Sequence, residues 1–148
     1  MPERSGPFWD AVEGRSPLPP AAASLGLEVI EDDPDNGTIE LAFEAVHDFT
    51  TPRGDVLEGY LAAMLHDTVG PAVLATLEPG QFIITLDLNA NFLRSAYPGR
   101  LVGRGSVVRR DADIAYAEAA STTRPARSSP PAPRRFVSST SRKSADGD

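Results

Sequence analysis

Residues 81–93 alternate strictly between two kinds of side chain, and this restricts the fold more than any other feature of the sequence. One face of the segment is apolar and consists of Phe82, Ile84, Leu86, Leu88, Ala90 and Phe92. The other face is mostly polar and consists of Gln81, Ile83, Thr85, Asp87, Asn89 and Asn91. A long strand with two unlike faces is typical of an antiparallel sheet that packs one face against a helix. We therefore predict an α+β fold.

The segment before this strand, residues 57–77, has the period of a helix. Its predicted core face consists of Leu57, Leu61, Met64, Leu65, Thr68 and Ala72. Asp55 lies just ahead as the predicted N-cap, with Glu58 three residues later as in a capping box. Gly70 and Pro71 predict a kink or irregularity near the end of this helix.

Four shorter segments complete the predicted domain, which spans residues 25–120. Residues 25–29 and 39–43 alternate on either side of the turn at residues 34–37, which predicts an antiparallel hairpin. Residues 101–110 and 114–120 are predicted to form two further strands. A long antiparallel sheet would then cover one apolar helix. In the separate N-terminal segment, residues 1–24, Phe8, Trp9 and Val12 indicate a short helix.

Composition excludes several classes of function. The 148 residues suffice for one domain with a real core, and the net charge of -7 argues against a nucleic-acid partner, because phosphate binding requires a basic surface. The chain contains no cysteine, which excludes disulfides, thiolate zinc sites and thiol nucleophiles. It has no apolar run of membrane-spanning length and no signal-peptide pattern. We expect a soluble cytoplasmic protein without a membrane partner.

The C-terminal residues 121–148 differ in character from the rest of the chain. They hold six basic residues and two acidic ones, whereas the first 120 residues hold 8 basic and 19 acidic residues. Four prolines lie between residues 125 and 133 and cannot sit within a strand ladder. The segment is therefore predicted to be a disordered basic tail. A second interpretation is a frameshift: deletion of one base near the codon for Ala119 would produce these residues in place of a turn and an apolar strand. The domain would then be incomplete, and the nucleotide sequence around that codon distinguishes the two interpretations.

The second face of the predicted helix carries small and ionisable residues, namely Gly59, Ala63, His66, Asp67 and Gly70. Small side chains allow another backbone or a ligand to come close, so this face could hold a substrate or a partner subunit. It could equally be a solvated face with a surface His-Asp pair. The helical pattern alone leaves both interpretations open.

Two segments, residues 49–70 and 85–99, resemble the hotdog-fold thioesterases of the phenylacetate-degradation (PaaI-like) type. In that family the pattern Asn-Pro-x-Gly-x-x-His-Gly-Gly leads into an apolar helix with an acidic residue. The resemblance implies a sheet wrapped around one central helix, and a homodimer or homotetramer whose sites lie between subunits. It also implies hydrolysis of an acyl-CoA thioester by water without a metal or redox cofactor. Backbone N–H groups at the helix start would face the thioester oxygen, and a helix carboxylate of the partner subunit would act on water.

The resemblance transfers unevenly to this chain. Gly59 matches the second glycine of the motif, whereas Glu58 stands at the first glycine and Leu57 replaces the histidine. Thr51 replaces the asparagine and retains a hydroxyl, and Thr85 matches a strand position where Ser or Thr helps to place the water. His66 occupies the position of the catalytic acid and is followed by Asp67. A histidine can act as a base at neutral pH. Among the arginines, Arg94 is the predicted ligand for CoA phosphates.

Three functional hypotheses follow. The first is hydrolysis of an aryl or medium-chain acyl-CoA, weak or lost because the catalytic set is altered. The second is a hotdog protein that binds acyl- or aryl-CoA without catalysis, which Leu57, Glu58 and His66 favour. The third is a defective, poorly folded gene product, which the interpretation of the tail as frameshifted favours.

Overall fold

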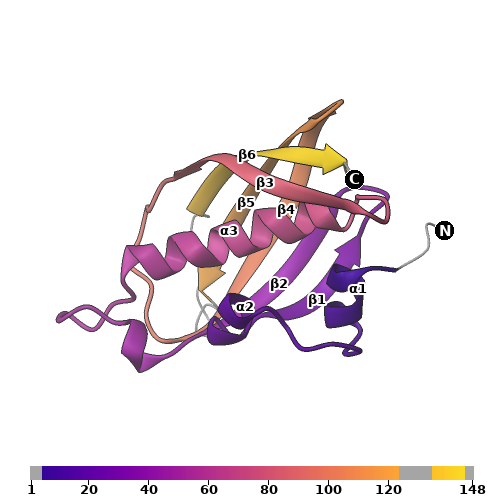
Figure 1. The fold of residues 1–148 in the computed structure, drawn as a ribbon. Helices are drawn as coiled ribbons and strands as arrows, with labels where there is room; N and C mark the ends of the chain where they lie inside the picture. The colour runs from indigo at the N-terminus through magenta and orange to yellow at the C-terminus, as the bar shows by residue number, and fades with distance from the viewer. Residues whose placement is uncertain (1–4, 124–134, 146–148) are drawn as a thin grey trace.

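A single antiparallel sheet curves around one long helix (Figure 1). The computed structural model describes residues 5–123 and 135–145. The helix is α3 (Glu58–Leu74). Six strands form the described sheet in the order β1-β2-β4-β5-β6-β3. Their bounds are β1 (Glu28–Asp33), β2 (Thr38–Ala45), β3 (Gln81–Ala90), β4 (Gly99–Asp111), β5 (Ile114–Thr123) and β6 (Arg135–Ala145). This is the expected α+β architecture of a hotdog fold.

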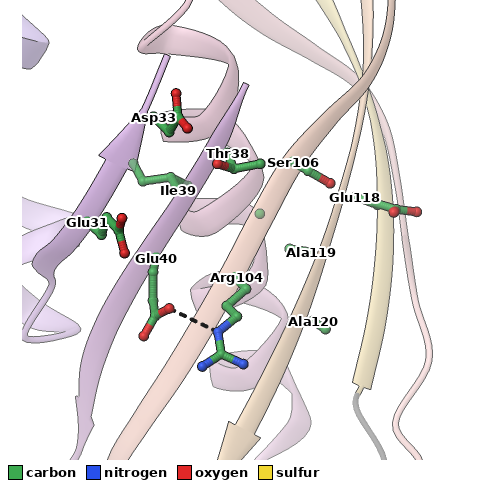
Figure 2. Close-up of a pocket in the computed structure, with 11 residues that line it drawn as sticks. Glu31, Asp33, Thr38, Ile39, Glu40, Arg104, Ser106, Glu118, Ala119 and Ala120 are labelled. Carbon is green, nitrogen blue, oxygen red and sulfur yellow. Dashed lines mark hydrogen bonds and ion pairs between the residues drawn. The ribbon is translucent and has the colours of Figure 1, made fainter. Parts of the chain in front are cut away.

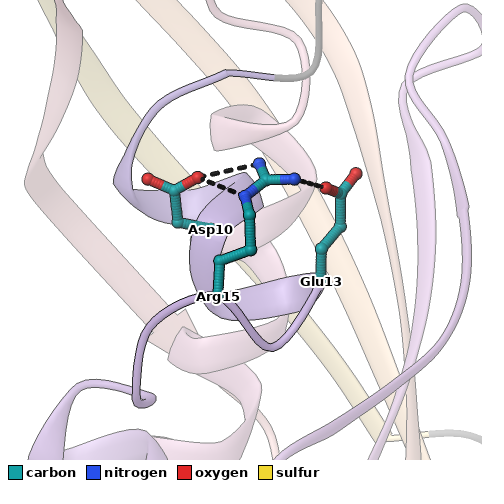
Figure 3. Close-up of polar contacts among 3 residues, drawn as sticks. All are labelled: Asp10, Glu13 and Arg15. Atoms are coloured by element: carbon teal, nitrogen blue, oxygen red, sulfur yellow. Dashed lines mark hydrogen bonds and ion pairs between the residues drawn. The ribbon is translucent and has the colours of Figure 1, made fainter.

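The N-terminal segment contributes two short helices, α1 (Pro7–Val12) and α2 (Pro20–Ser24). Each begins at a proline, whose fixed φ and missing N–H suit the first position of a helix. The Arg15 guanidinium lies 2.8 Å from Asp10 Oδ1 and also pairs with Glu13, which closes the loop after α1 (Figure 3). A short 3₁₀ helix, η1 (His47–Phe49), precedes the loop that leads into α3. Among the described residues, no helix combines the length and apolarity that a membrane crossing requires.

Helix α3 lies close to the middle of the sheet because two glycines of β4 present no side chain to it. A Cβ at Gly103 would lie 2.5 Å from Thr68 Oγ1, and a Cβ at Gly105 would lie 3.0 Å from the Thr68 carbonyl oxygen. Two buried clusters flank this contact, one around Leu41, Phe43, Leu61 and Met64 and the other around Leu65, Val69, Val73 and the alanines of β5. The contact therefore fixes the distance between helix and sheet on which both clusters depend.

The start of α3 differs from the capping-box prediction. The N-cap residue is Leu57, which is half-exposed rather than part of the core, and no side chain caps the helix. Asp55 is buried and accepts hydrogen bonds from the Thr51 hydroxyl and, at 3.4 Å, from the Arg53 guanidinium. The Asp55 carboxylate therefore forms its hydrogen bonds within the loop and does not cap the N-terminus of α3. The helix continues through Pro71 to Leu74.

The two faces of β3 also differ from the prediction, because the strand contains a register shift between Thr85 and Asp87. An extra residue in a strand reverses which side chains point inward beyond that position. Ile83 and Thr85 face the helix before the shift, and Leu88 and Ala90 pack on the core after it. The apolar residues Phe82, Ile84 and Leu86 are consequently exposed on the outer face. The single apolar face predicted for residues 82–92 is therefore wrong.

The disordered tail predicted for residues 121–148 is corrected at two places. Strand β5 continues to Thr123, and residues 135–145 form β6, which pairs with β5 on one side and β3 on the other. The four prolines that motivated the prediction lie at residues 125–133, outside the described residues. Residues 135–145 contain no proline, so every residue can offer an N–H group to the ladder. The frameshift hypothesis stays a prediction about the gene.

Candidate active site

The centre of the site is a contact between the helix and the strand that follows it. His66 Nε2 on α3 lies 2.9 Å from the Thr85 hydroxyl oxygen on β3, and both side chains are half-buried. The two residues meet because Thr85 precedes the register shift in β3 and so faces the helix. The structure thus brings together two of the residues that the sequence singled out, from positions 19 residues apart. An imidazole beside a hydroxyl can accept a proton from a nearby water and position that water.

Asp67 follows His66 on α3 and is held in an unfavourable environment. Its Oδ2 is buried and has no hydrogen-bond partner among the described residues. Burial raises the pKa of Asp67 above its ordinary value, and the charge of His66 opposes this rise. A carboxyl with these properties next to a basic ring is typical of a functional site rather than of a solvated helix face.

This environment predicts that Asp67 costs stability at neutral pH. Since folding raises the pKa of this carboxyl, the cost grows as the pH rises from the ordinary pKa toward the folded-state pKa, and it is complete above the folded-state pKa. It is absent below the ordinary pKa of about 3.9. We expect Asp67→Asn to raise the Tm at pH 7 by about 2 °C, with no gain near pH 3.5. Thermal unfolding followed by circular dichroism at both pH values measures this, with the exposed turn variant Asp113→Asn as the control. A Tm that falls at pH 7 in the Asp67 variant alone would contradict the account.

A largely apolar cavity of about 470 Å³ opens beside these three residues. It lies between α1, α3 and the beginning of β3, and its polar lining includes His66, Asp67 and Thr85 together with Glu78 and Gln81. Its apolar wall includes Phe8, Trp9, Leu27, Val29, Pro71 and Leu74. The volume falls within the range of about 300–1,000 Å³ that is usual for small-molecule sites. The cavity can therefore hold an apolar group with its reactive end beside His66.

A second pocket, of about 370 Å³, lies on the face of the sheet away from α3 (Figure 2). Its side chains include the carboxylates Glu31, Asp33, Glu40 and Glu118, and Arg104 is bound to Glu40 at 3.0 Å. This surplus of negative charge repels phosphate groups. The pocket is therefore a poor site for a phosphorylated ligand, and the cavity beside His66 is the better candidate.

The start of α3 offers backbone N–H groups at some distance from His66. Gly59 is exposed, and a Cβ at that position would meet nothing within 4 Å, so another molecule can approach its backbone. The first N–H groups of a helix lack partners within the helix and favour negative charge. Gly59 and His66 are seven residues apart, or about 10 Å along the helix. One subunit therefore does not bring both groups to one reacting carbonyl.

Two further predicted residues lie elsewhere. The Thr51 hydroxyl binds the Asp55 carboxylate, and this hydrogen bond is the main cause that lowers the pKa of Asp55, with the charge of Arg53 adding to it. Thr51 therefore fixes the loop before α3, and its hydroxyl is engaged. Arg94 is exposed in the loop after β3 and does not line the cavity beside His66. Phe8 and Trp9 do line this cavity, although their sequence pattern predicted only a short helix. The available signal was the presence of two aromatic side chains in a largely polar segment.

Comparison with known families decides to which family this fold belongs. The model of the thioesterase superfamily matches residues 53–127, about half of the chain, from the loop before α3 through β5. The chain belongs to the thioesterase superfamily. The matched segment of this thioesterase-superfamily chain contains His66, Asp67 and Thr85, whereas α1 lies outside it. No curated protein sequence matches the chain.

Solved structures agree with this membership. A phenylacetic acid degradation-related protein from Ralstonia eutropha JMP134 is 31% identical, with a TM-score of 0.81 over 91% of this chain and 98% of that one. A thioesterase family protein from Silicibacter pomeroyi has a TM-score of 0.81 at 21% identity, over 95% of this chain and 100% of that one. The Escherichia coli PaaI protein has a TM-score of 0.76 at 13% identity, over 93% and 94% of the two chains. At these low identities, the similarity to the last two proteins shows a shared fold only.

Proposed function

We propose that this thioesterase-superfamily chain hydrolyses an aryl or medium-chain acyl-CoA thioester with water, at a low rate for its family. The observation that supports this most is the His66–Thr85 contact in the lining of the largely apolar cavity. The acyl group would lie in the cavity, and the thioester carbonyl would lie beside His66. Family membership supports thioester hydrolysis in general, and the nature of the acyl group is our proposal.

In the proposed reaction, water attacks the thioester carbonyl carbon while its proton passes to His66 Nε2. The Thr85 hydroxyl positions that water. The carbonyl oxygen gains charge in the transition state, and N–H groups at the start of α3 in a partner subunit stabilise it. The carbon–sulfur bond then breaks, and the CoA sulfur receives the proton from His66. Glu58 lies in the first turn of α3 and adds negative charge near the developing oxyanion, which lowers the rate.

A second candidate function is binding of acyl- or aryl-CoA without hydrolysis. The observation that favours it is the hydrogen bond between His66 Nε2 and the Thr85 hydroxyl. Because this bond already uses Nε2, that atom is less able to accept a proton from water. In that function the cavity would still hold the acyl group. The two candidates share a ligand and differ only in turnover.

Release of free CoA distinguishes the candidates. Purified chain is incubated with phenylacetyl-CoA, octanoyl-CoA and palmitoyl-CoA, and the CoA thiol is titrated with a chromogenic reagent. The absence of cysteine removes any protein thiol from this signal. We expect slow turnover of the first two substrates and none of the third. If the chain binds a non-hydrolysable CoA thioether but releases no CoA from the three thioesters, the binding function replaces hydrolysis. Absence of both binding and CoA release would support a defective product.

We further propose that two copies join at the free edge of β3. Both edge strands of the described sheet, β1 and β3, have one unpaired side. Acidic residues at Glu28, Glu31, Asp32 and Asp33 protect β1 from edge-to-edge pairing. Strand β3 instead exposes Phe82, Ile84 and Leu86, each more than 40% exposed. An edge strand with three exposed apolar side chains and a single charged residue, Asp87, favours a partner sheet.

This proposal predicts that a charge on β3 dissociates the oligomer. We expect the unaltered chain to show a mass of two or four times 15.7 kDa in light scattering after size exclusion. Ile84→Lys should give the monomer mass, because a buried, unpaired ammonium in the interface is costly. The matched control is Ile30→Lys, at a comparably exposed residue on the other edge strand. A monomeric unaltered chain, or an unchanged mass in the Ile84 variant, would contradict the proposal.

A further inference from the structure

One wall of the cavity is built by the N-terminal segment, outside the residues that the family model matches. Helix α1 lies beside the C-terminal half of α3 (Figure 1). Phe8, Trp9 and Val12 of α1 line the same cavity as Gly70, Pro71 and Leu74 of α3. Trp9 is only 6% exposed, and its ring meets that of Phe8 edge to face at a centroid distance of 5.0 Å. A bulky and buried side chain therefore forms part of the wall of the cavity that also contains His66.

The lining of the cavity is not uniform, which favours one direction for a bound ligand. His66, Asp67 and Thr85 give it polar groups at one helix–strand contact, and Phe8 and Trp9 give it an aromatic surface from α1. An acyl group with its carbonyl beside His66 would therefore extend toward α1. Its length would be limited by the distance to Trp9, since a buried indole in a packed wall has little room to move.

The wall itself is held in place by specific contacts. A six-residue helix is too short to be stable alone, so α1 depends on the packing of its apolar side chains. The Arg15 contacts with Asp10 and Glu13 close the loop behind it (Figure 3). The Glu13 N–H also donates to the Trp9 carbonyl oxygen at 2.8 Å. The position of the Trp9 ring is thus tied to the backbone that follows it.

We propose that Trp9 is a specificity-determining residue that limits the acyl group to a compact shape, such as an aryl ring, and excludes long chains. This inference rests on the proposed function for the identity of the ligand. Substitution of Trp9 by a small residue would enlarge the cavity at α1. The preference should then move from ring-bearing acyl groups toward extended chains.

The test measures binding, so that it does not depend on turnover. Two non-hydrolysable CoA thioethers, one with a phenyl-bearing acyl mimic and one with a ten-carbon mimic, are titrated by calorimetry. We expect the unaltered chain to bind the phenyl compound at least tenfold more tightly, and Trp9→Ala to remove or reverse this preference. Trp9→Phe keeps an aromatic wall and should show an intermediate ratio. Val108→Ala, at an exposed residue on β4 that does not line the cavity, should leave the ratio unchanged.

A second readout uses Trp9 itself, which is the only tryptophan of the chain. Its fluorescence should change on binding of the phenyl thioether to the unaltered chain, even if Trp9→Ala fails to fold. Binding with unchanged fluorescence, or equal affinity for both thioethers in the unaltered chain, would overturn the inference while leaving hydrolysis possible. A chain that binds with the expected preference and releases no CoA would overturn the proposed function alone. Absence of binding to either compound would overturn both.

Discussion

Replacement of His66 by aspartate is expected to raise the turnover of phenylacetyl-CoA and octanoyl-CoA by about 10- to 100-fold. The reason lies in the number of acceptor atoms at this position. In the unaltered chain the ring nitrogen Nε2 forms a hydrogen bond of 2.9 Å with the Thr85 hydroxyl, and a neutral imidazole has only one acceptor nitrogen. A carboxylate has two oxygens, so one can bind Thr85 while the other accepts the proton of water. The sequence resemblance also implies an acidic residue at this position of the helix.

Two further variants, compared with His66→Asp, test whether the carboxylate is the cause of the higher turnover. His66→Asn has the shape of the aspartate variant without its basicity and should not exceed the unaltered chain. His66→Glu restores part of the reach of the imidazole and shows whether the length of the side chain limits the reaction. Initial rates of CoA release at several substrate concentrations separate kcat from KM. Vigorous turnover by the unaltered chain, with no change in His66→Asp, would contradict the proposed origin of the low rate.

Introduction of a methyl group at Gly103 is expected to destabilise the fold by about 2–3 kcal/mol, which corresponds to a fall in Tm of about 5–10 °C. The added Cβ of Gly103→Ala would lie 2.5 Å from Thr68 Oγ1, well inside van der Waals contact. Thr68 has little freedom to withdraw, because it is fully buried and its hydroxyl donates to the Met64 carbonyl oxygen at 2.8 Å. The helix would have to shift away from β4 and disturb both core clusters.

A double variant tests this cause directly. In Gly103→Ala/Thr68→Ala the two atoms nearest to the new Cβ, Oγ1 and Cγ2 of Thr68, are removed. The remaining Cβ of residue 68 lies 3.4 Å from the new Cβ, which is an ordinary contact. The second substitution should therefore recover part of the lost stability in chemical unfolding. Gly59→Ala is the matched control, since its Cβ meets nothing within 4 Å and alanine favours a helix. Equal stability of Gly103→Ala and the unaltered chain would show that the helix–sheet contact is looser than described.

Sequence periodicity was sufficient for the order of the elements from β1 to β5, although not for β6. The helical spacing of Leu61, Met64, Leu65 and Thr68 predicts the buried face of α3, and all four residues are buried. The family resemblance predicts the hotdog fold, and the match to the thioesterase superfamily confirms it. These features depend on local spacing, which a sequence displays directly.

The features that sequence reasoning missed depend on contacts between distant segments. The shift in β3 between Thr85 and Asp87 reflects pairing with β6, and alternation alone does not reveal an inserted residue. Strand β6 was missed because the neighbouring prolines suggested disorder for the whole segment. The contact between Thr51 and Asp55 competed with helix capping, which the sequence favoured. Nothing in the spacing of Phe8 and Trp9 indicates that they close a cavity against α3.

The central claim is that the acyl group of a CoA thioester lies in the cavity between α1 and α3, with its carbonyl beside His66. A crystal structure of the full chain with a non-hydrolysable phenyl-bearing CoA thioether tests it most directly. The account predicts the phenyl group next to Trp9 and the carbonyl oxygen or its mimic within about 3.5 Å of Thr85 Oγ1 or His66 Nε2. A ligand bound in the acidic pocket around Arg104, or one that leaves the cavity beside His66 empty, would contradict the account.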